Sequence, residues 1–360
     1  MPTRPITQHA PGTAPGTLAS RPHAEDPRLH LIAYSPTELL EVKGPDALDK
    51  LAALRRSHDV VWLNVDGLRD AELIARVGAL FDLHPLALED VLNAHQRPKV
   101  DPYDDHLYIA MRMLEIHDDR LDHEQVSVFV GDGFVLTIQE HTGDCLDPVR
   151  QRLRIGQGRL RTTASDYLTY TIVDAVVDQL FPLLEAYAER LTEVELQILQ
   201  GTDEQAIIAL QHIRHDLGTI RRVIWPLRDT LTTLGRGDEP RFGPETQLYL
   251  RDTLDHVERA LDIVEDHRDT AASLVDLFLG LASHRMNDVM KLLTVLGTIF
   301  LPLSFMTGLY GMNFDPSSSA WSMPELATPY GYPVLIGAML LVAGALLAWF
   351  HRLGWLRTSR

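Results

Sequence analysis

Hydrophobic and polar positions follow different patterns in the first and the later parts of this 360-residue chain. Between about residues 29 and 147, short runs of β-branched and aromatic residues alternate with two stretches of helical spacing, which predicts an α/β or α+β domain with a sheet. The last two runs flank Gly131-Asp132-Gly133, which predicts a hairpin because glycine adopts positive φ without steric cost. The predicted strands are Leu31–Tyr34, Val60–Val65, Leu107–Leu114, Gln125–Val130 and Phe134–Gln139, and the predicted helices are Asp46–Leu54 and Asp70–Phe81.

From about Ser165 onward the strand pattern stops and helical spacing takes over. Asp166–Gln200 predicts one helix that is interrupted at Pro182. Glu204–Leu234 predicts a second helix, interrupted at Pro226, because proline removes a backbone hydrogen bond inside a helix.

An unbroken helical run extends from about Glu245 to Phe300, with apolar residues at every third or fourth position. At ~1.5 Å per residue a helix of this extent would span roughly 80 Å, which is typical of a coiled coil or a stalk. The alternative interpretation is a pair of helices broken near Asp266-His267.

Two stretches near the C-terminus carry no charge, Leu292–Tyr310 and Tyr332–Phe350, and each has 19 residues. Helices of this length cross a hydrocarbon layer of ~30 Å, so both are predicted to be transmembrane. Pro302 lies within the first stretch. It is tolerated there because neighbouring helices can satisfy the freed backbone groups.

The distribution of basic residues predicts the orientation of these two spans. The connecting segment Gly311–Gly331 contains neither lysine nor arginine, whereas both outer flanks are basic. Basic flanks remain in the cytoplasm, so both termini are predicted to be cytoplasmic and the short loop external. The single cysteine, Cys145, agrees with a reducing compartment for the large polar part. The flanking basic residues are Arg285, Lys291, Arg352, Arg357 and Arg360.

The overall charge and the motif content exclude several functions. A formal net charge of -17 argues against nucleic acid as a partner, because neutralising phosphates requires clustered lysine and arginine. No nucleophile elbow, phosphate-binding loop or dinucleotide fingerprint is present, so an enzyme is not predicted. The segment from Met1 to about Pro27 lacks the apolar core of a secretory signal, and its Pro- and Ala-rich composition indicates a disordered tail.

Small and polar side chains form a stripe along the first predicted span. Two helices per chain cannot enclose a polar pore, so a transporter of this design needs several subunits, each with one helix facing a shared axis. The centre of the second span offers no hydrogen-bonding side chain, which favours the first as the pore wall. A helix-packing seam would also explain the stripe, and the pattern alone does not decide. The stripe consists of Asn287, Met290, Thr294, Gly297, Leu301, Ser304 and Gly308.

The tripeptide Gly311-Met312-Asn313 directly follows this first span. Glycine permits a tight turn, and asparagine supplies a neutral carbonyl oxygen. A ring of such oxygens suits Mg²⁺, which dehydrates reluctantly and keeps several of its waters. The motif is too short to be specific alone. Its position directly after a predicted membrane helix is what makes it informative.

These residues also carry a resemblance to a known family. The run MNDVMKLLTVLGTIFLPLSFMTGLYGMNF (Met286–Phe314), with MPEL at Met323–Leu326 and GYP at Gly331–Pro333, resembles the CorA family of Mg²⁺ channels. Upstream segments are similar too, so the resemblance covers essentially everything after about residue 30. They are HPLALEDVLNAHQRPKV, DYLTYTIVDAVVDQLFPLLE and RRVIWPLRDTL, which begin at His84, Asp166 and Arg221.

The resemblance implies a funnel-shaped homopentamer: an α+β cytosolic domain with a mixed sheet and helices, then a long stalk helix and two transmembrane helices. It also implies roles for single residues. The external ion mouth would consist of Gly311, Met312, Asn313 and Glu325; the pore and gate of Asp276, Asn287, Met290, Leu293, Leu301 and Ser304; and an intersubunit site for regulatory Mg²⁺ of Asp90, Asp252 and Glu89.

The predicted parts of the chain follow from these patterns. They are a tail at 1–28, an α/β cytosolic domain at 29–160, a helical hairpin at 161–242, a stalk helix at 243–288, the first membrane helix at 289–310, an external loop at 311–331, the second membrane helix at 332–350 and a basic cytosolic end at 351–360. The loop stretch DPSSSAWS after Phe314 is longer than the family pattern.

The predicted function is Mg²⁺ uptake, with Co²⁺ or Ni²⁺ as further cargo, across the cytoplasmic membrane. Facing carboxylates between subunits repel each other unless a divalent ion neutralises them, so internal Mg²⁺ would hold the channel closed. The alternatives are a Zn²⁺ transporter of the branch that shares the Gly-Met-Asn turn, and a membrane-bound Mg²⁺ sensor that conducts nothing.

Two further groups of possible ligands are interpreted as surface residues. His212, His215 and Asp216 have zinc-ligand spacing on a predicted helix, but no further ligand is evident. The second group precedes a strand and is interpreted as a solvated loop; its members are His117, Asp118, Asp119, Asp122, His123 and Glu124.

Overall fold

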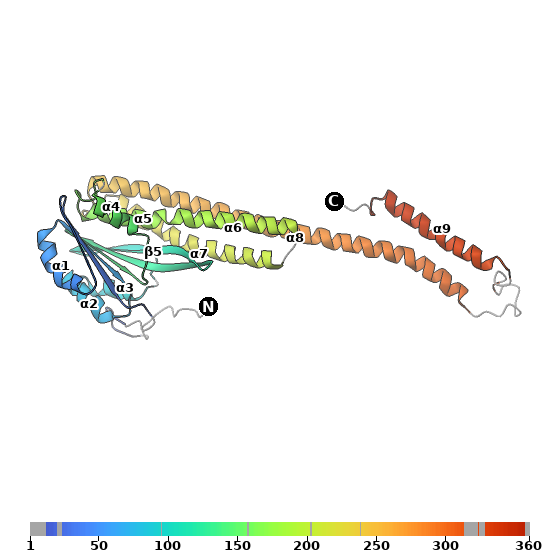
Figure 1. Cartoon of the computed structure of the whole chain (residues 1–360), viewed down its shortest axis with the longest axis horizontal. Helices are drawn as coiled ribbons and strands as arrows, with labels where there is room; N and C mark the ends of the chain where they lie inside the picture. Colours follow the sequence, from blue (N-terminus) through green and yellow to red (C-terminus); the bar gives the residue numbers. More distant parts are fainter. Residues whose placement is uncertain are drawn as a thin grey trace. The chain divides into compact units, whose positions relative to one another are not determined.

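The computed structural model describes residues 12–19, 24–94, 96–156, 158–201, 204–237, 239–312, 323 and 328–356. The chain divides into two compact units, Met1–Leu274 and Val275–Arg360. The first unit contains a seven-stranded sheet and most of the helices (Figure 1). The second contains the C-terminal part of one long helix and the last helix.

The sheet has the strand order β2-β1-β3-β7-β6-β5-β4. Only β3 and β7 pair in parallel, and the other neighbours are antiparallel, so the sheet is mixed as predicted. The strands are β1 (Arg28–Tyr34), β2 (Leu39–Lys43), β3 (Val60–Asp66), β4 (Lys99–Pro102), β5 (His106–His117), β6 (Arg120–Gly131) and β7 (Phe134–Gln139). All five predicted strands are confirmed, and the short, polar edge strands β2 and β4 were not predicted.

Two hairpins join β5, β6 and β7. Gly133, at φ +67°, closes the predicted turn between β6 and β7, where Gly131 pairs with Phe134. The interpretation of residues 117–124 as a solvated loop is wrong, because β5 and β6 stay paired as far as His117 and Arg120. Only Asp118 and Asp119 form the turn, at φ 46° and 67°, the left-handed values that a tight hairpin needs. The polar side chains on these strand ends interrupt the alternation of apolar and polar residues from which strands are predicted, so the sequence did not indicate them.

The helices α1 (Asp46–Ser57), α2 (Ala71–Leu80) and α3 (Pro85–Leu92) cover one face of the sheet (Figure 1). Their apolar residues pack with those of β1, β3, β6 and β7 into one core. Asp70 caps α2 by accepting the backbone N–H groups of Glu72 and Leu73 at 3.0 Å. His84 caps α3 in the same way. The predicted helices α1 and α2 are confirmed, and α3 was not predicted.

The other face is covered by α4 (Asp147–Ile155), α5 (Ser165–Asp178), α6 (Leu180–Gln200) and α7 (Glu204–Gly235) (Figure 1). The break between α5 and α6 falls at Gln179, because Pro182 fits the first turn of α6, where its missing N–H is not needed. The predicted interruption at Pro226 is wrong: α7 is continuous through this proline. The buried apolar stripe of α7, from Ala206 to Leu234, offsets the lost backbone hydrogen bond.

The longest element is α8, which extends from Pro244 to Tyr310 without a break. Its 67 residues include Asp266, His267 and Pro302. The alternative of two helices broken near Asp266-His267 is therefore wrong. After the loop, α9 extends from Gly331 to Arg352.

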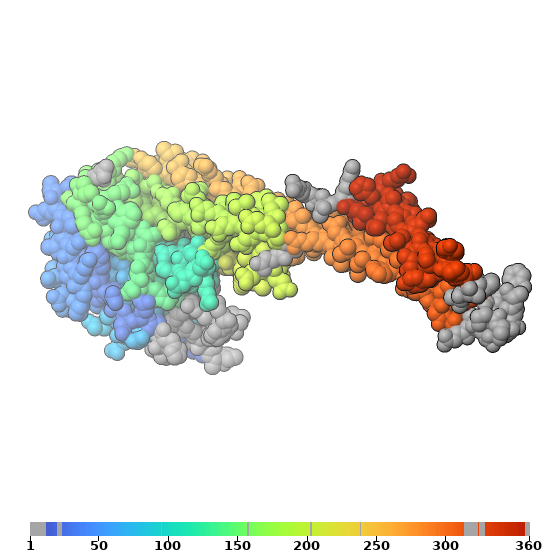
Figure 2. All heavy atoms as spheres, turned by 45° about the vertical axis from the view of Figure 1, so that its right-hand side comes forward, coloured from blue at the N-terminus to red at the C-terminus, as the bar shows by residue number. Residues whose placement is uncertain are grey.

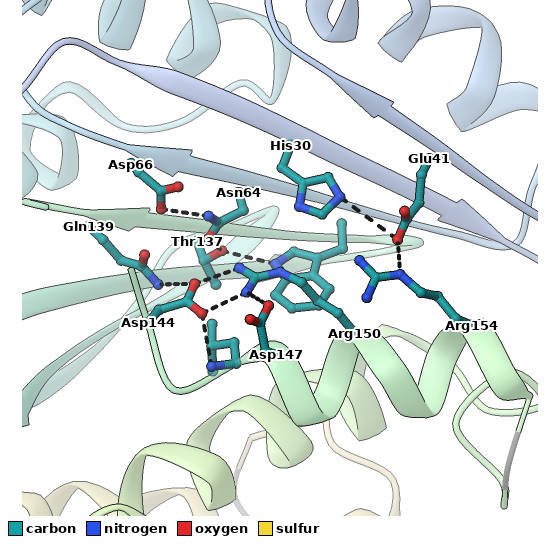
Figure 3. Close-up of polar contacts among 12 residues, drawn as sticks. His30, Glu41, Asn64, Asp66, Thr137, Gln139, Asp144, Asp147, Arg150 and Arg154 are labelled. Atoms are coloured by element: carbon teal, nitrogen blue, oxygen red, sulfur yellow. Dashed lines mark hydrogen bonds and ion pairs between the residues drawn. The ribbon is translucent and has the colours of Figure 1, made fainter. Parts of the chain in front are cut away.

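A buried polar cluster fixes α4 on the sheet (Figure 3). Arg150, only 7% exposed in its side chain, donates to both oxygens of Asp144, at 2.6 and 2.5 Å. The same guanidinium lies over the Trp62 ring, 5.3 Å from its centroid. Trp62 in turn donates to Thr137 at 2.9 Å, and Thr137 donates to Asn64 at 2.5 Å. Because Arg150 and Asp144 neutralise each other, their burial does not leave an isolated charge.

Part of the segment predicted to be a disordered tail contacts the first unit. The backbone N–H of Gly16 donates to Glu89 on α3 at 2.6 Å. Glu25 accepts the backbone N–H of Thr142 at 2.9 Å, and Arg69 pairs with Asp26 at 2.8 Å. Residues 12–19 and 24–27 therefore belong to the folded unit.

The hairpin end of β5 and β6 lies beside α6. Figure 2 shows this end of the sheet (teal) next to α6 (yellow-green). Arg190 of α6 forms an ion pair with Asp119 in the hairpin turn. This pair anchors the part of β5 and β6 that extends beyond β7.

Candidate functional site

Two helices of the second unit are long and apolar enough to cross a membrane: the C-terminal part of α8, and α9. Only 6% of the apolar window in each is buried within the chain. Large apolar side chains are exposed on both, as at Leu301 (74%) on α8 and Leu341 (72%) on α9. Such exposure is not stable in water, so these surfaces need lipid or other subunits around them.

The predicted stripe lies on one side of α8. Because successive residues of an α-helix turn by about 100°, residues at alternating spacings of three and four stay on one face. Relative to Met290, the predicted positions from Asp276 to Gly308 fall within about 60° to either side. Since α8 is continuous through Pro302, this face is uninterrupted over its length.

The side chains of this face make few contacts within the chain. Met290 is 59% exposed and Leu293 62%, and Asn287, Ser304 and Asp276 are exposed as well. Val295, which lies about 140° around the helix from Met290, is 5% exposed. The chain therefore packs on itself away from the stripe, and the stripe stays available.

Charge on this part of α8 is kept off the stripe. Asp288 and Lys291 pair with each other at 3.0 Å on a different side of the helix. Thr294 donates its hydroxyl to the Met290 carbonyl at 2.8 Å. From Asn287 to Gly308 the exposed face thus presents apolar and neutral polar groups.

Two of the predicted ion-mouth residues, Gly311 and Met312, directly follow the end of α8. The backbone N–H of Gly311 donates to the Thr307 carbonyl at 2.9 Å and closes the last helical turn. Met312 follows and is 50% exposed. Asn313 and Glu325, the other two predicted mouth residues, lie outside the described residues.

In the first unit, the predicted regulatory residues Glu89 and Asp90 lie on α3 and are half-buried. Asp90 accepts from Lys99 at 2.6 Å and from Gln96 at 2.8 Å. Glu89 accepts the backbone N–H of Gly16. Both carboxylates are therefore partnered within this chain, and a metal ion would have to displace or share these partners.

The third predicted regulatory residue, Asp252, lies exposed on α8 beside a metal-ligand cluster that was not predicted. Asp174 and Asp178 of α5 and His256 of α8 place their ligand atoms within 4.8 Å of one another. Asp252 is one helical turn from His256, and its charge acts on Tyr170, which lies next to Asp174. These residues form one acidic surface across α5 and α8.

The electrostatics of this cluster favour a cation. Burial, followed by the neighbouring charge of Asp174, raises the pKa of Asp178. Thr253 donates to Asp174 at 2.8 Å, and the nearest ring nitrogen of His256 is 3.6 Å from Asp178. A divalent ion would relieve the repulsion between the carboxylates. The sequence contained one signal for this cluster. Asp174 and Asp178 are four residues apart, as are Asp252 and His256, and residues at this spacing lie on one face of a helix.

The structure does not bring Asp90 and Asp252 together within one chain. Helix α3 lies on the face of the sheet opposite to α5, and the N-terminal part of α8 contacts α5 (Figure 1). A site that uses both residues therefore requires two chains.

The pair His212 and His215 on α7 does not form a ligand cluster. Both are exposed, and Asp216 accepts from the Tyr187 hydroxyl at 2.9 Å. In the part of the chain that the structure describes, Asp174, Asp178 and His256 are the one group of three ligands found within this distance.

Comparisons with known proteins agree with this arrangement. The chain is 37% identical, over 96% of its length and 97% of the relative's, to the cobalt/magnesium transport protein CorA of Thermotoga maritima. Its structure is similar to that of the CorA magnesium transporter of Methanocaldococcus jannaschii, with a TM-score of 0.76, 20% identity and coverage of 91% and 98% of the two chains. It also resembles the ZntB cytoplasmic domain of Vibrio parahaemolyticus, with a TM-score of 0.55, 16% identity and coverage of 71% and 99%.

A family match covers most of the chain. Residues 57–352 match the family described as CorA-like Mg²⁺ transporter protein. The matched part includes the five strands from β3 to β7, the stripe on α8 and the helix α9. The family is one of membrane transporters and not of enzymes. With its mixed sheet, its long helix α8 and two apolar C-terminal helices, the chain belongs to the family of CorA-like Mg²⁺ transporters.

Proposed function

We propose that this chain forms an oligomeric channel that passes Mg²⁺, and also Co²⁺ or Ni²⁺, across the cytoplasmic membrane along the electrochemical gradient. The observation that carries the proposal is the uninterrupted stripe on the exposed face of α8, which is free of charge from Asn287 to Gly308. Hydrated cations need a wall of this kind: neutral oxygens where the ion rests and apolar side chains where the path can close.

The proposed assembly is a homopentamer, with one α8 helix per subunit around the axis. Asn313 would bind the ion through its water shell at the external mouth, with Gly311 and Met312 shaping the turn and Glu325 attracting cations.

The apolar gate, which closes by excluding water, would consist of Met290, Leu293 and Leu301. Asn287 and Ser304 would add polar rings, and Asp276 an acidic ring on the cytosolic side. Both termini would be cytoplasmic.

The proposed regulation uses Mg²⁺ as both cargo and inhibitor. Asp90 and Glu89 of one subunit would face Asp252 of the next, with the Asp174, Asp178 and His256 cluster beside it. Support comes from the position of α3, which carries Asp90, on the face of the sheet opposite to α5, and from the crowded carboxylates of α5. Bound Mg²⁺ would hold the subunits together. Its loss would let the subunits separate, and water would then enter the apolar gate.

Ion flux tests the proposed function. Full-length protein in proteoliposomes is expected to take up Mg²⁺ when the interior is negative, without a proton gradient. Uptake should fall as internal Mg²⁺ rises. Absence of uptake for Mg²⁺, Co²⁺ and Ni²⁺ under every gradient would exclude the channel and leave the non-conducting sensor as the explanation.

A Zn²⁺ transporter is the second candidate, and His256 is the observation that favours it. An imidazole beside two carboxylates suits Zn²⁺ better than Mg²⁺, which prefers oxygen ligands alone. In the same proteoliposomes, Zn²⁺ uptake that exceeds Mg²⁺ uptake and depends on a proton gradient would support this candidate.

Replacing Asp252 with asparagine is expected to weaken inhibition by internal Mg²⁺. The change removes one charge from the α5–α8 surface while keeping the size of the side chain, so the ion loses a ligand. More internal Mg²⁺ should then be needed to stop uptake, and to protect the protein against protease. Asp262→Asn is the matched control, since Asp262 is also exposed on α8 but lies outside the cluster. Equal Mg²⁺ dependence in both variants would contradict the regulatory role of Asp252.

A further inference from the structure

A lysine side chain bridges two carboxylates at the position where the proposed regulatory site needs one of them. Lys99 Nζ lies 2.6 Å from Asp90 Oδ2 and 2.5 Å from Asp101 Oδ2. One carboxylate belongs to α3 and the other to β4. The three side chains are between 23% and 36% exposed, so both ion pairs are partly shielded from water.

The strand β4 places the lysine between the two carboxylates. Lys99 and Asp101 are two residues apart on this strand, so their side chains point to the same face of the sheet. Asp90, near the C-terminal end of α3, reaches the same ammonium group from the neighbouring helix. The fold therefore holds one cation between two anions.

The Asp90 carboxylate is fixed in place, whereas the lysine can move away from it. Buried Gln125 donates to the Asp90 backbone carbonyl at 2.9 Å, and Gln96 donates to Asp90 Oδ1 at 2.8 Å. Lys99 reaches the second oxygen, Oδ2, through a flexible stem of four carbon atoms. Of these two side chains bound to the carboxylate, the mobile one carries the charge.

The surroundings of Lys99 keep it charged. Burial alone would lower its pKa, but the hydrogen bonds to Asp101 and Asp90 outweigh this effect and raise the pKa of Lys99. Its Nζ also lies over the Tyr108 ring, 5.6 Å from the centroid, where the electrons of the ring attract a cation. The chain thus supplies Asp90 with a counter-charge of its own.

A divalent ion and the ammonium group compete for the Asp90 carboxylate. Both would lie next to the same oxygens, and two cations that close in a partly shielded site repel each other. Gln96 can stay bound to Oδ1 because it is neutral. Lys99 can turn fully to Asp101, which already accepts from it. An arriving ion therefore has one group to displace, and that group has another partner.

We propose that Lys99 is an internal competitor of divalent cations at Asp90, and that Asp101 is the carboxylate to which it withdraws. Lys99 thereby sets the Mg²⁺ concentration at which the regulatory site fills, because the ion must first displace a tethered cation. Without this competitor the site would fill at lower internal Mg²⁺, and uptake would stop earlier. This role of Lys99 rests on the proposed regulation through Asp90.

Protease protection of the full-length protein in detergent tests this role without a measurement of ion flux. The protein is stripped with EDTA, titrated with Mg²⁺ and exposed to a fixed amount of protease. The quantity compared is the Mg²⁺ concentration that gives half-maximal protection. Lys99→Met should lower it by roughly two- to fivefold, since a partly exposed ion pair no longer has to be broken. Lys99→Arg keeps the competing charge and should need as much Mg²⁺ as the wild type.

Arg97→Met is the matched control for the loss of a positive charge. Arg97 is exposed two residues before Lys99, and it is not among the described partners of Asp90. This variant should need as much Mg²⁺ as the wild type. Damage to the fold cannot imitate the result expected for Lys99→Met, because a damaged protein is cleaved faster and needs more Mg²⁺. An unchanged or higher Mg²⁺ requirement in Lys99→Met would overturn the proposal and would mean that the lysine only ties β4 to α3.

A change of opposite sign is expected for Asp101→Asn. This variant removes the carboxylate to which Lys99 withdraws, so more Mg²⁺ should be needed for protection. In the Lys99→Met background the same change should have no effect, because no lysine remains to withdraw. Asp104→Asn, which changes an exposed acid in the turn after β4, is the control and should behave as the wild type. An equal effect of Asp101→Asn with and without Lys99 would overturn the role of Asp101.

Asp90→Asn separates a failure of this role from a failure of the proposed regulation. If Asp90→Asn needs more Mg²⁺ than the wild type, the regulatory site uses Asp90, and the result for Lys99→Met then decides the role of the lysine. Adding Lys99→Met to Asp90→Asn should no longer lower the Mg²⁺ requirement, because the two residues act through one contact. If Asp90→Asn is protected as the wild type is, the regulatory assignment of Asp90 is wrong and the role of Lys99 fails with it.

Discussion

Replacing Asn313 with alanine is expected to reduce Mg²⁺ uptake into proteoliposomes to background. Helix α8 ends at Tyr310, with Gly311 closing its last turn, so Asn313 follows the end of the proposed pore wall. Each subunit would contribute one side-chain carbonyl oxygen, and a ring of them would bind the waters of the incoming ion. Alanine offers no such oxygen, and Mg²⁺ does not give up its water shell without a replacement.

Two variants make this result specific. Ser317→Ala changes a residue of the same loop and should leave uptake unchanged. Asn313→Gln keeps the amide but moves it outward by one methylene, so partial uptake is expected. Full Mg²⁺ uptake by Asn313→Ala would mean that the mouth lies elsewhere, and the pore assignment along α8 would have to be revised.

Replacing Arg150 with methionine is expected to destabilise the first unit by about 3–5 kcal/mol, because it leaves Asp144 buried without its counter-charge. Asp144 is only 4% exposed, and its pKa lies below the usual range because Arg150 outweighs the effect of burial. The loss also uncovers the Trp62 ring beneath the guanidinium. Denaturant unfolding of the full-length protein, followed by tryptophan fluorescence, measures the effect.

Arg154→Met is the matched control on the same helix. Arg154 pairs with Glu41 at 2.8 Å but is 42% exposed, so its loss should cost less than about 1 kcal/mol. Replacing Asp144 and Arg150 together by apolar residues should cost less than Arg150→Met alone, because no buried charge then remains. If Arg150→Met were no more destabilising than Arg154→Met, the buried pair would not be what fixes α4.

The sequence was sufficient for those parts of the fold that depend on long, regular patterns. The two apolar helices, the continuous stalk and the five inner strands each extend over enough residues for hydrophobic spacing to define them. Pro226 shows where local propensity misleads: packing of the buried face of α7 outweighs one missing backbone hydrogen bond. The strand ends around Asp118 were hidden because charged side chains replace the usual apolar alternation.

The candidate sites were predictable to different degrees. The stripe on α8 could be read from one helix, since all its residues share a single periodic pattern. The cluster of Asp174, Asp178 and His256 could not, because it depends on the packing of α5 against α8, which are separated by two helices in the chain.

The environment of Cys145 has a practical consequence for work on the assembly. It is the only cysteine of the chain, and burial raises the pKa of its thiol to about 12. At neutral pH it therefore stays a thiol, which reacts slowly with oxidants and maleimides because the thiolate is the reactive form. A cysteine engineered at one exposed position of α8 would react almost alone, without removing the native residue first. Disulfide formation between such cysteines would then report directly which faces of neighbouring α8 helices meet in the membrane.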